Sequence, residues 1–134
     1  MSEIELLEVE AMSDKLTLIV GATINTSRYA YFAASRLARA GVPFIPIGIK
    51  TGEVFGEKII DLRSKPQLEN IHTITLYIGT ANQEEWIDYL IGLSPKRIIF
   101  NPGTENPIFF QKANAKGIEV LEACTLVMLS ANQY

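Results

Sequence analysis

The chain has 134 residues, a formal net charge of -3 at pH 7 and a hydrophobic fraction of 48%. These values predict a single globular domain over residues 1–134, and they exclude a protein that coats nucleic acid. No apolar run approaches the roughly 18 residues that a membrane span needs, and Cys124 is the only cysteine. We therefore expect a cytoplasmic protein without disulfides that binds neither nucleic acid nor membrane.

The first 14 residues are predicted to form a leading helix or an acidic extension. Ile4, Leu7 and Ala11 recur at helical spacing. Glutamates occupy most of the other side: Glu3, Glu5, Glu8 and Glu10. This pattern favours an amphipathic helix that packs on the body of the protein, and a frayed extension is the alternative.

An alternation of strands and helices begins after this segment. The β-branched run "LTLIV" (16–20) is typical of a buried strand. A helix is predicted over 28–41, with Ser27 as its N-cap and Gly41 at its end. The run "PFIPI" (43–47) indicates a second strand.

Residues 48–70 are less regular, with turns at three glycines and an extended piece, "GEKIIDL". Three further strands are predicted beyond this stretch: 73–78, 97–100 and 118–121. Five strands that alternate with helices predict a parallel sheet with helices on both faces. Because parallel crossovers are right-handed, the expected fold class is α/β, a three-layer Rossmann-like domain with a doubly wound, mainly parallel five-stranded sheet.

Two helices are expected to connect the last three strands. Residues 80–83 and 82–85 both have the spacing of a capping box before "EEWIDYLIGL". Asn106, followed by proline, is expected to cap the second helix. A short helix that begins near Cys124 closes the chain.

The turn after the first strand is the first candidate for a ligand site, because ligands in doubly wound folds lie beyond the carboxyl ends of the strands. Gly21 and Ala22 lack bulk, so that backbone can approach a ligand closely. Thr23 and Ser27 add hydroxyl groups, and the N-terminus of the following helix favours an anion. Arg28 offers a fork of donors that suits phosphate. Taken alone, the turn is equally consistent with phosphate binding and with a simple strand–helix connection.

Two common nucleotide motifs are absent from this turn. The dinucleotide pattern G-x-G-x-x-G would need glycines where Thr23 and Thr26 stand, and no Walker loop is present. An NAD-binding chain would carry an acidic residue about 20 positions after the glycine turn, to hold the ribose 2′-OH. Residues 46–50 of this chain contain Lys50 and no acidic residue. These departures disfavour NAD and ATP and leave NADP as an alternative ligand.

The order and spacing of several segments resemble the small stand-alone CoA-binding proteins, whose fold is that of the nucleotide domain in the succinyl-CoA synthetase α subunit. The resemblance is carried by "IVGATINTSRYAYFAASRLARAGVPFIPIGIKTGEVFGEKI", by "NPGTEN" and by "GIEVLEACTLVML". It covers essentially residues 5–130. It implies that the chain binds coenzyme A or acyl-CoA.

The resemblance also implies roles at matching positions. The turn 21–23 corresponds to the family turn that meets the nucleotide phosphates, and Ser27 and Arg28 correspond to the start of the adjoining helix. Gly48 and Lys50 follow the second strand, where the family holds the adenosine ribose and its 3′-phosphate. Lys50 is the natural counter-charge for that phosphate.

Other matches and departures lie further along the chain. Asn101 and Gly103 correspond to a family turn after the fourth strand, and Cys124 corresponds to a late cysteine. Gly79 stands where the family often carries an Arg-Pro or Pro-rich turn beside the ligand. A glycine there leaves room but removes the charge that an arginine would supply. Ile47 also stands where the family has an asparagine before a proline, which loosens that loop.

The residues offer no catalytic constellation. His72, the only histidine, precedes the third strand at the amino end of the sheet, away from the expected site. One histidine and one cysteine are too few for a His/Cys zinc site, so no metal is expected. Glu105 is the acid nearest the expected crevice. Cys124 at a helix N-terminus could form a mixed disulfide with the coenzyme's thiol, or pack as a small apolar residue.

Three functions remain open. The favoured one is a non-catalytic protein that binds coenzyme A or acyl-CoA, as a homodimer or with a partner enzyme. The alternatives are an NADP-dependent oxidoreductase or other nucleotide-using enzyme on the same fold, and a protein–protein module with a vestigial pocket.

Overall fold

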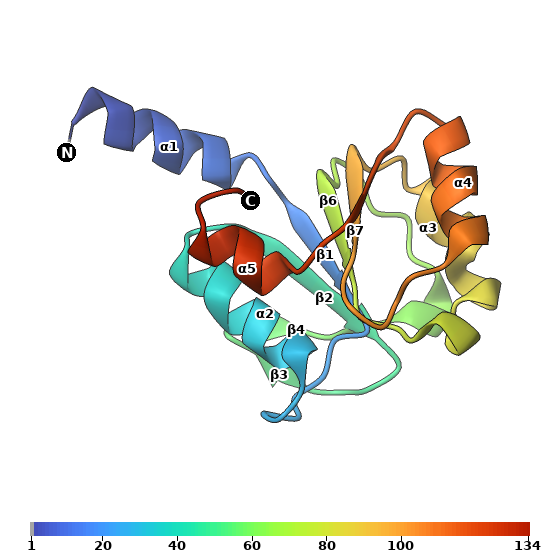
Figure 1. The fold of residues 1–134 in the computed structure, drawn as a ribbon. Coiled ribbons are helices and arrows are strands. Elements are labelled where there is room, and N and C mark those ends of the chain that lie inside the picture. Colours follow the sequence, from blue (N-terminus) through green and yellow to red (C-terminus); the bar gives the residue numbers. More distant parts are fainter. Residues whose placement is uncertain (1) are drawn as a thin grey trace.

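The computed structural model describes residues 2–134, except for the side chains of residues 8–11. Within this part of the chain, six parallel strands form one sheet in the order β5-β2-β1-β6-β7-β8 (Figure 1). The strands are β1 Thr17–Val20, β2 Phe44–Gly48, β5 Ile60–Asp61, β6 Thr73–Leu76, β7 Arg97–Phe100 and β8 Glu119–Glu122. The expected fold class is confirmed, with the edge strand β5 added to the five predicted strands.

Helices and short turns connect these strands. The α-helices are α1 Glu3–Ser13, α2 Tyr29–Arg39, α3 Ile87–Gly92, α4 Pro107–Ala115 and α5 Thr125–Ser130. The 3-10 helices are η1 Leu62–Ser64, η2 Thr80–Asn82 and η3 Glu84–Trp86. A two-stranded antiparallel hairpin, β3 Glu53–Val54 and β4 Glu57–Lys58, lies between β2 and β5 in the sequence.

Successive residues of a strand point to opposite sides, and every residue of the inner strands β1, β6 and β7 is buried, so these strands are covered on both faces. In β1, Leu18 and Val20 pack in a cluster with Leu90 of α3, whereas Ile19 packs in a cluster with Leu37 of α2. Figure 1 shows α2 and α5 on one side of the sheet and α3 and α4 on the other. This arrangement explains the continuous apolar runs 18–20 in β1 and 98–100 in β7.

The leading helix exists as α1, but the predicted packing of Ile4 and Leu7 on the body is wrong, and Met12 near the end of the helix packs against the core instead. Figure 1 shows α1 projecting away from the sheet, and Ile4, Leu6 and Leu7 are 70%, 48% and 58% exposed. The physical reason is the placement of Leu6, which lies about 200° around the helix from Ile4 and so prevents a single apolar stripe. The side chain of Ala11 lies outside the described residues. None of the described helices is long and apolar enough to cross a membrane.

The N-terminus of α2 differs from the prediction, since Ser27 does not cap it. Arg28 is the N-cap residue, and no described side chain caps the helix. Ser27 belongs to the preceding turn, where its N–H and its hydroxyl both donate to Asn25 Oδ1, at 3.0 and 2.7 Å. The first amides of α2 therefore keep their hydrogen-bonding capacity for another acceptor.

The predicted capping boxes before α3 are wrong as well, whereas the cap of α4 is confirmed. Residues 80–86 form η2 and η3, neither of which has a side-chain cap. Gln83 is buried, and its Nε2 donates to the carbonyls of Ile78 and Thr104 at 2.8 and 2.7 Å. Asn106 Oδ1 accepts from the N–H groups of Ile108 and Phe109, as expected for an N-cap.

His72 lies at the amino edge of the sheet, as predicted, beside a buried arginine. Arg97 is 7% exposed, its guanidinium carbon lies 4.4 Å from the ring centre of Tyr134, and its Nε donates to Thr73 Oγ1 at 2.7 Å. The same hydroxyl lies 2.7 Å from His72 Nδ1. Burial, followed by the neighbouring charge of Arg97, lowers the pKa of His72 from its ordinary value of 6.5.

This lowered pKa predicts that acid weakens the fold before the carboxylates titrate. As pH falls through 6.5, the unfolded chain takes up a proton on His72 that the folded chain resists, so the free energy of unfolding decreases. We expect the Tm to fall between pH 7.5 and 5.5, and His72→Gln to reduce that fall. Thermal unfolding of both proteins at several pH values measures this, and equal slopes would contradict it.

Candidate functional site

The strand order places a candidate site at the carboxyl ends of β1 and β6. From β1 the chain moves outward to β2 on one side, and it returns through β6 on the other side. Doubly wound folds bind ligands at this reversal of strand order. A cavity of about 630 Å³ opens there, within the usual range for small-molecule sites.

Most of the ligand residues predicted from the sequence line this cavity. They are Gly21, Ala22, Thr23, Arg28, Gly48, Lys50, Gly79 and Gly103. The fold thus brings together the turn after β1, the start of α2, the end of β2 and the turns after β6 and β7. Ser27, Asn101 and Cys124 lie outside the lining.

The turn after β1 is fastened to β2 rather than open to a ligand. The N–H groups of Gly21 and Ala22 both donate to the carbonyl of Ile47, at 2.9 and 3.1 Å. Free donors stand instead at the start of α2, where Tyr29 and Ala30 supply its first amides and also line the cavity. An anion would therefore meet the N-terminus of α2 and the side chain of Arg28.

Gly48 permits the close approach between β2 and this turn. A Cβ added at Gly48 would lie 2.9 Å from the carbonyl oxygen of Ala22 and 3.1 Å from its nitrogen, both backbone atoms. Such a side chain would push the turn away from β2 and distort the wall of the cavity.

Gly48→Ala is therefore expected to lower the free energy of unfolding by about 1–3 kcal/mol. Gly79→Ala is the matched control, because a Cβ there meets nothing within 4 Å and the φ of Gly79 is -58°. Thermal unfolding of the two variants measures the difference. A Gly48→Ala protein as stable as Gly79→Ala would contradict the close approach.

Asn101 is part of a buried network rather than of the lining. Its Nδ2 donates to Thr75 Oγ1 and to the carbonyl of Leu76, at 2.8 and 2.9 Å. Its Oδ1 accepts from the N–H of Thr125 at 2.9 Å. Both ends of the side-chain amide are thus engaged in holding α5 on β6 and β7. Cys124, the N-cap of α5, is half-buried and forms no side-chain cap.

The lining also contains residues that the sequence analysis did not assign to the site. Asn82, Glu85 and Trp86 come from η2 and η3, which follow β6. Leu62 of η1 and Thr104, beyond β7, also face the cavity. For all of them except Leu62, which follows the unpredicted strand β5, the position after the carboxyl end of a predicted strand was the signal that could have found them.

Charge is distributed unevenly around the cavity. Arg28 and Lys50 lie on the side of β1 and β2, whereas the acid Glu85 lies on the side of β6. All three side chains are exposed. The β1–β2 side is accordingly the place for the anionic part of a ligand.

The lining offers little for acid–base chemistry near neutral pH. Burial raises the pKa of Tyr77 to about 12, and its hydroxyl is buried without a hydrogen-bond partner among the described residues. The lining holds no histidine or cysteine. Within the described part of the chain, no cluster of three or more residues has the chemistry to hold a metal ion.

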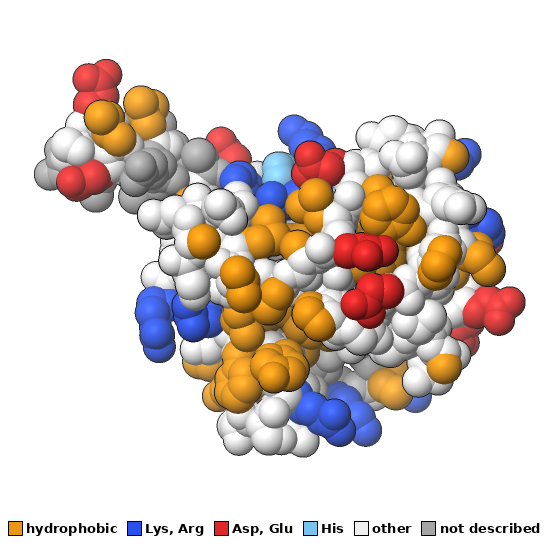
Figure 2. Space-filling model, viewed as in Figure 1, with side chains coloured by type: hydrophobic (Ala, Val, Ile, Leu, Met, Phe, Trp, Pro, Cys, Tyr) orange, Lys and Arg blue, Asp and Glu red, His pale blue; other side chains and the backbone are white. Residues whose placement is uncertain are grey.

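Apolar side chains gather next to this site. Figure 2 shows them over α2 and α5, and the exposed ones on these helices include Tyr29, Phe32 and Val127. The rings of Tyr29 and Phe32 meet edge to face with their centres 6.0 Å apart. Tyr29 thus forms an aromatic rim beside Arg28.

Comparisons with known proteins agree with this geometry. A family model described as CoA binding domain matches residues 15–130. A solved structure described as an uncharacterized protein is 51% identical, with a TM-score of 0.86 over 90% of this chain and 98% of its own. No curated protein matches the chain.

More distant solved structures share the fold. The cell-free ID.343 protein from Thermus thermophilus is 21% identical, with a TM-score of 0.74 over the whole of both chains. A hypothetical protein from Pyrococcus horikoshii OT3 is 22% identical, with a TM-score of 0.75 over 98% of this chain and 92% of its own. The family model spans all six strands of the sheet and every segment that lines the cavity. The chain therefore belongs to the CoA binding domain family.

Proposed function

We propose that this protein binds coenzyme A or acyl-CoA in the cavity at the carboxyl ends of β1 and β6, without catalysing a reaction of its own. The observation that carries the proposal is the uncapped N-terminus of α2, which lines the cavity beside Arg28. Free amides at a helix N-terminus and a guanidinium are together a strong site for a diphosphate.

Lys50 supports coenzyme A over a ligand with a single phosphate group. It lines the cavity from the segment after β2, whereas Arg28 lines it from the start of α2. Coenzyme A carries a ribose phosphate in addition to its diphosphate, so that each cation has an anionic partner. The pantetheine arm would then leave toward η2 and η3, where Trp86 and Ile78 supply apolar contact.

A binding role also fits the chemistry of the lining. Thr23 and Thr104 offer hydroxyl groups, but the lining offers neither of them an imidazole or thiol partner for nucleophilic catalysis. The protein would hold the coenzyme in the cytoplasm, as a homodimer or for a partner enzyme.

Calorimetric titration with four ligands tests the proposal. Coenzyme A or acetyl-CoA should bind with a measurable heat, and NAD, which lacks the ribose phosphate, should not bind. NADP is the informative competitor, because it also carries a ribose phosphate. Binding of NADP without binding of coenzyme A would replace the proposed function by a nicotinamide-dependent one.

A further inference from the structure

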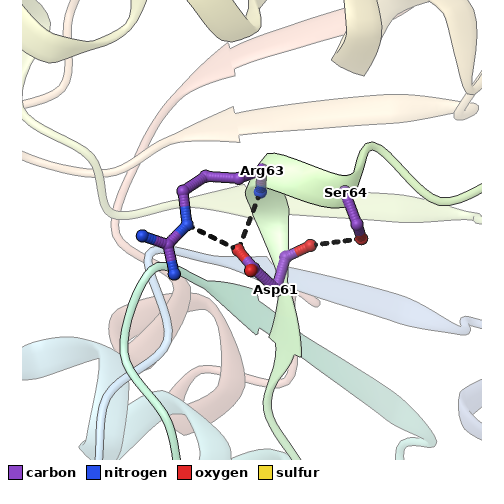
Figure 3. Close-up of polar contacts among 3 residues, drawn as sticks. All are labelled: Asp61, Arg63 and Ser64. Atoms are coloured by element: carbon purple, nitrogen blue, oxygen red, sulfur yellow. Dashed lines mark hydrogen bonds and ion pairs between the residues drawn. The ribbon is translucent and has the colours of Figure 1, made fainter.

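A salt-bridged arginine stands outside the cavity lining, at the edge of the sheet next to β2. Arg63 belongs to η1, directly after the edge strand β5. Asp61 Oδ1 accepts from Arg63 Nε at 2.9 Å and from the N–H of Arg63 at 3.0 Å, and Ser64 Oγ donates to the carbonyl of Asp61 at 2.7 Å (Figure 3). The first of these contacts directs the guanidinium along Asp61, and the other two order the backbone at the start of η1.

The register of the sheet brings this arginine to the side of the cavity. Asp61 lies opposite Gly48 in the parallel pairing of β5 with β2. Lys50 and Arg63 therefore both stand two residues beyond the same register pair, at the same edge. Leu62, between Asp61 and Arg63, is 1% exposed in the core and also lines the cavity. Figure 3 shows the guanidinium reaching toward the carboxyl end of β2.

The pairing leaves most of the guanidinium available. Asp61 engages only Nε, and no described residue accepts a hydrogen bond from the two terminal NH2 groups of Arg63. The side chains of Arg63 and Asp61 are 63% and 52% exposed, and ion pairs this exposed contribute little to stability. A guanidinium whose terminal groups remain free to donate is suited to a phosphate.

The position of Arg63 separates it from the phosphate site at α2. It follows β5, which is two strands from β1 in the sheet order. Neighbouring strands lie about 4.8 Å apart, so the two positions are about 10 Å apart across the sheet. Arg63 and the start of α2 therefore approach the cavity from different strands of the sheet.

We propose that Arg63 binds, together with Lys50, the ribose phosphate of coenzyme A, while the start of α2 and Arg28 bind the diphosphate. This inference rests on the proposed function, and it adds a specificity residue to it. Arg63 also supplies a positive charge at a site whose other wall, at Gly79, carries none.

Titration with coenzyme A and with dephospho-CoA, which lacks only the ribose phosphate, tests the role of Arg63. Arg63→Gln should lower the affinity for coenzyme A about tenfold and leave the affinity for dephospho-CoA unchanged. Lys112→Gln is the matched control, because Lys112 is an exposed cation paired with Asp88 on another part of the surface and its loss changes the net charge equally. It should leave both affinities unchanged. Equal melting temperatures will verify that both variants are folded.

The outcomes separate this inference from the function on which it rests. If the Arg63→Gln variant bound coenzyme A as tightly as the wild type, Arg63 would not bind the ribose phosphate, and the proposed function would still stand. An equal loss of affinity for both ligands would also overturn it. A wild-type protein that binds neither ligand would overturn both proposals.

Discussion

Replacing Arg28 and Lys50 together by alanine is expected to lower the affinity for coenzyme A about 100-fold. Each side chain lines the cavity and offers a charge-assisted hydrogen bond to a phosphate. Losing one such contact at an exposed site corresponds to about tenfold in affinity. The two losses should add because the side chains meet different phosphates. Calorimetric titration of the two single variants and the double variant measures them.

A control variant separates contact with the ligand from a general change in charge. Arg36→Ala also removes a cation from α2, but Arg36 donates to Ser130 Oγ at 2.6 Å and is not part of the cavity lining. Its affinity for coenzyme A should equal that of the wild type. A double variant that still binds like the wild type would show that the ligand lies elsewhere.

Replacing Asn101 by alanine is expected to lower the free energy of unfolding by about 3 kcal/mol, or roughly 10 °C in Tm. The change removes buried hydrogen bonds to Thr75, Leu76 and Thr125, and it leaves the N–H of Thr125 without its acceptor. Each stranded buried group costs about 1–3 kcal/mol. Thermal unfolding measures the loss.

The same variant tests whether Asn101 also contacts the ligand. Both ends of the Asn101 side-chain amide are engaged within the protein. The affinity of Asn101→Ala for coenzyme A, measured well below the melting temperature, should therefore differ from that of the wild type by less than about threefold. Asn82→Ala, in the exposed lining, serves as the stability control and should unfold at the temperature of the wild type. If Asn101→Ala kept the Tm of the wild type but lost its affinity for coenzyme A, Asn101 would be a ligand-binding residue and not a structural one.

The sequence predicted the sheet well because its strands carry a simple signal. Runs such as 18–20 and 98–100 are apolar on both faces, which is typical of strands covered by helices on both sides. The edge strand β5 lies within the predicted extended piece 56–62, but it pairs through only two residues, Ile47 with Ile60 and Gly48 with Asp61, so the sequence did not show that it joins the sheet. The packing of α1 was mispredicted, because Ile4 and Leu7 suggested an apolar face that Leu6 does not share.

The sequence predicted site residues correctly where their position after a strand end is enough to place them at the cavity. It failed where the direction of the side chain determines whether the residue lines the cavity. The turn after β1 and Lys50 follow strand ends, and the fold necessarily brings strand ends of a parallel sheet to one edge. Asn101 follows β7 just as directly, yet its side chain turns back into the sheet. Gln83, expected to cap α3, instead holds the turns after β6 and β7 together. The spacing of residues in the sequence does not indicate in which direction these two side chains point.

Amide chemical shifts during titration with coenzyme A test the central claim most directly. If the ligand lies at the carboxyl ends of β1 and β6, the largest shifts should fall on residues 21–30 and 48–50, with smaller ones near 79–86 and 102–104. The amino edge around His72 should stay unchanged. Shifts concentrated at that edge, or none at saturating coenzyme A, would contradict the account.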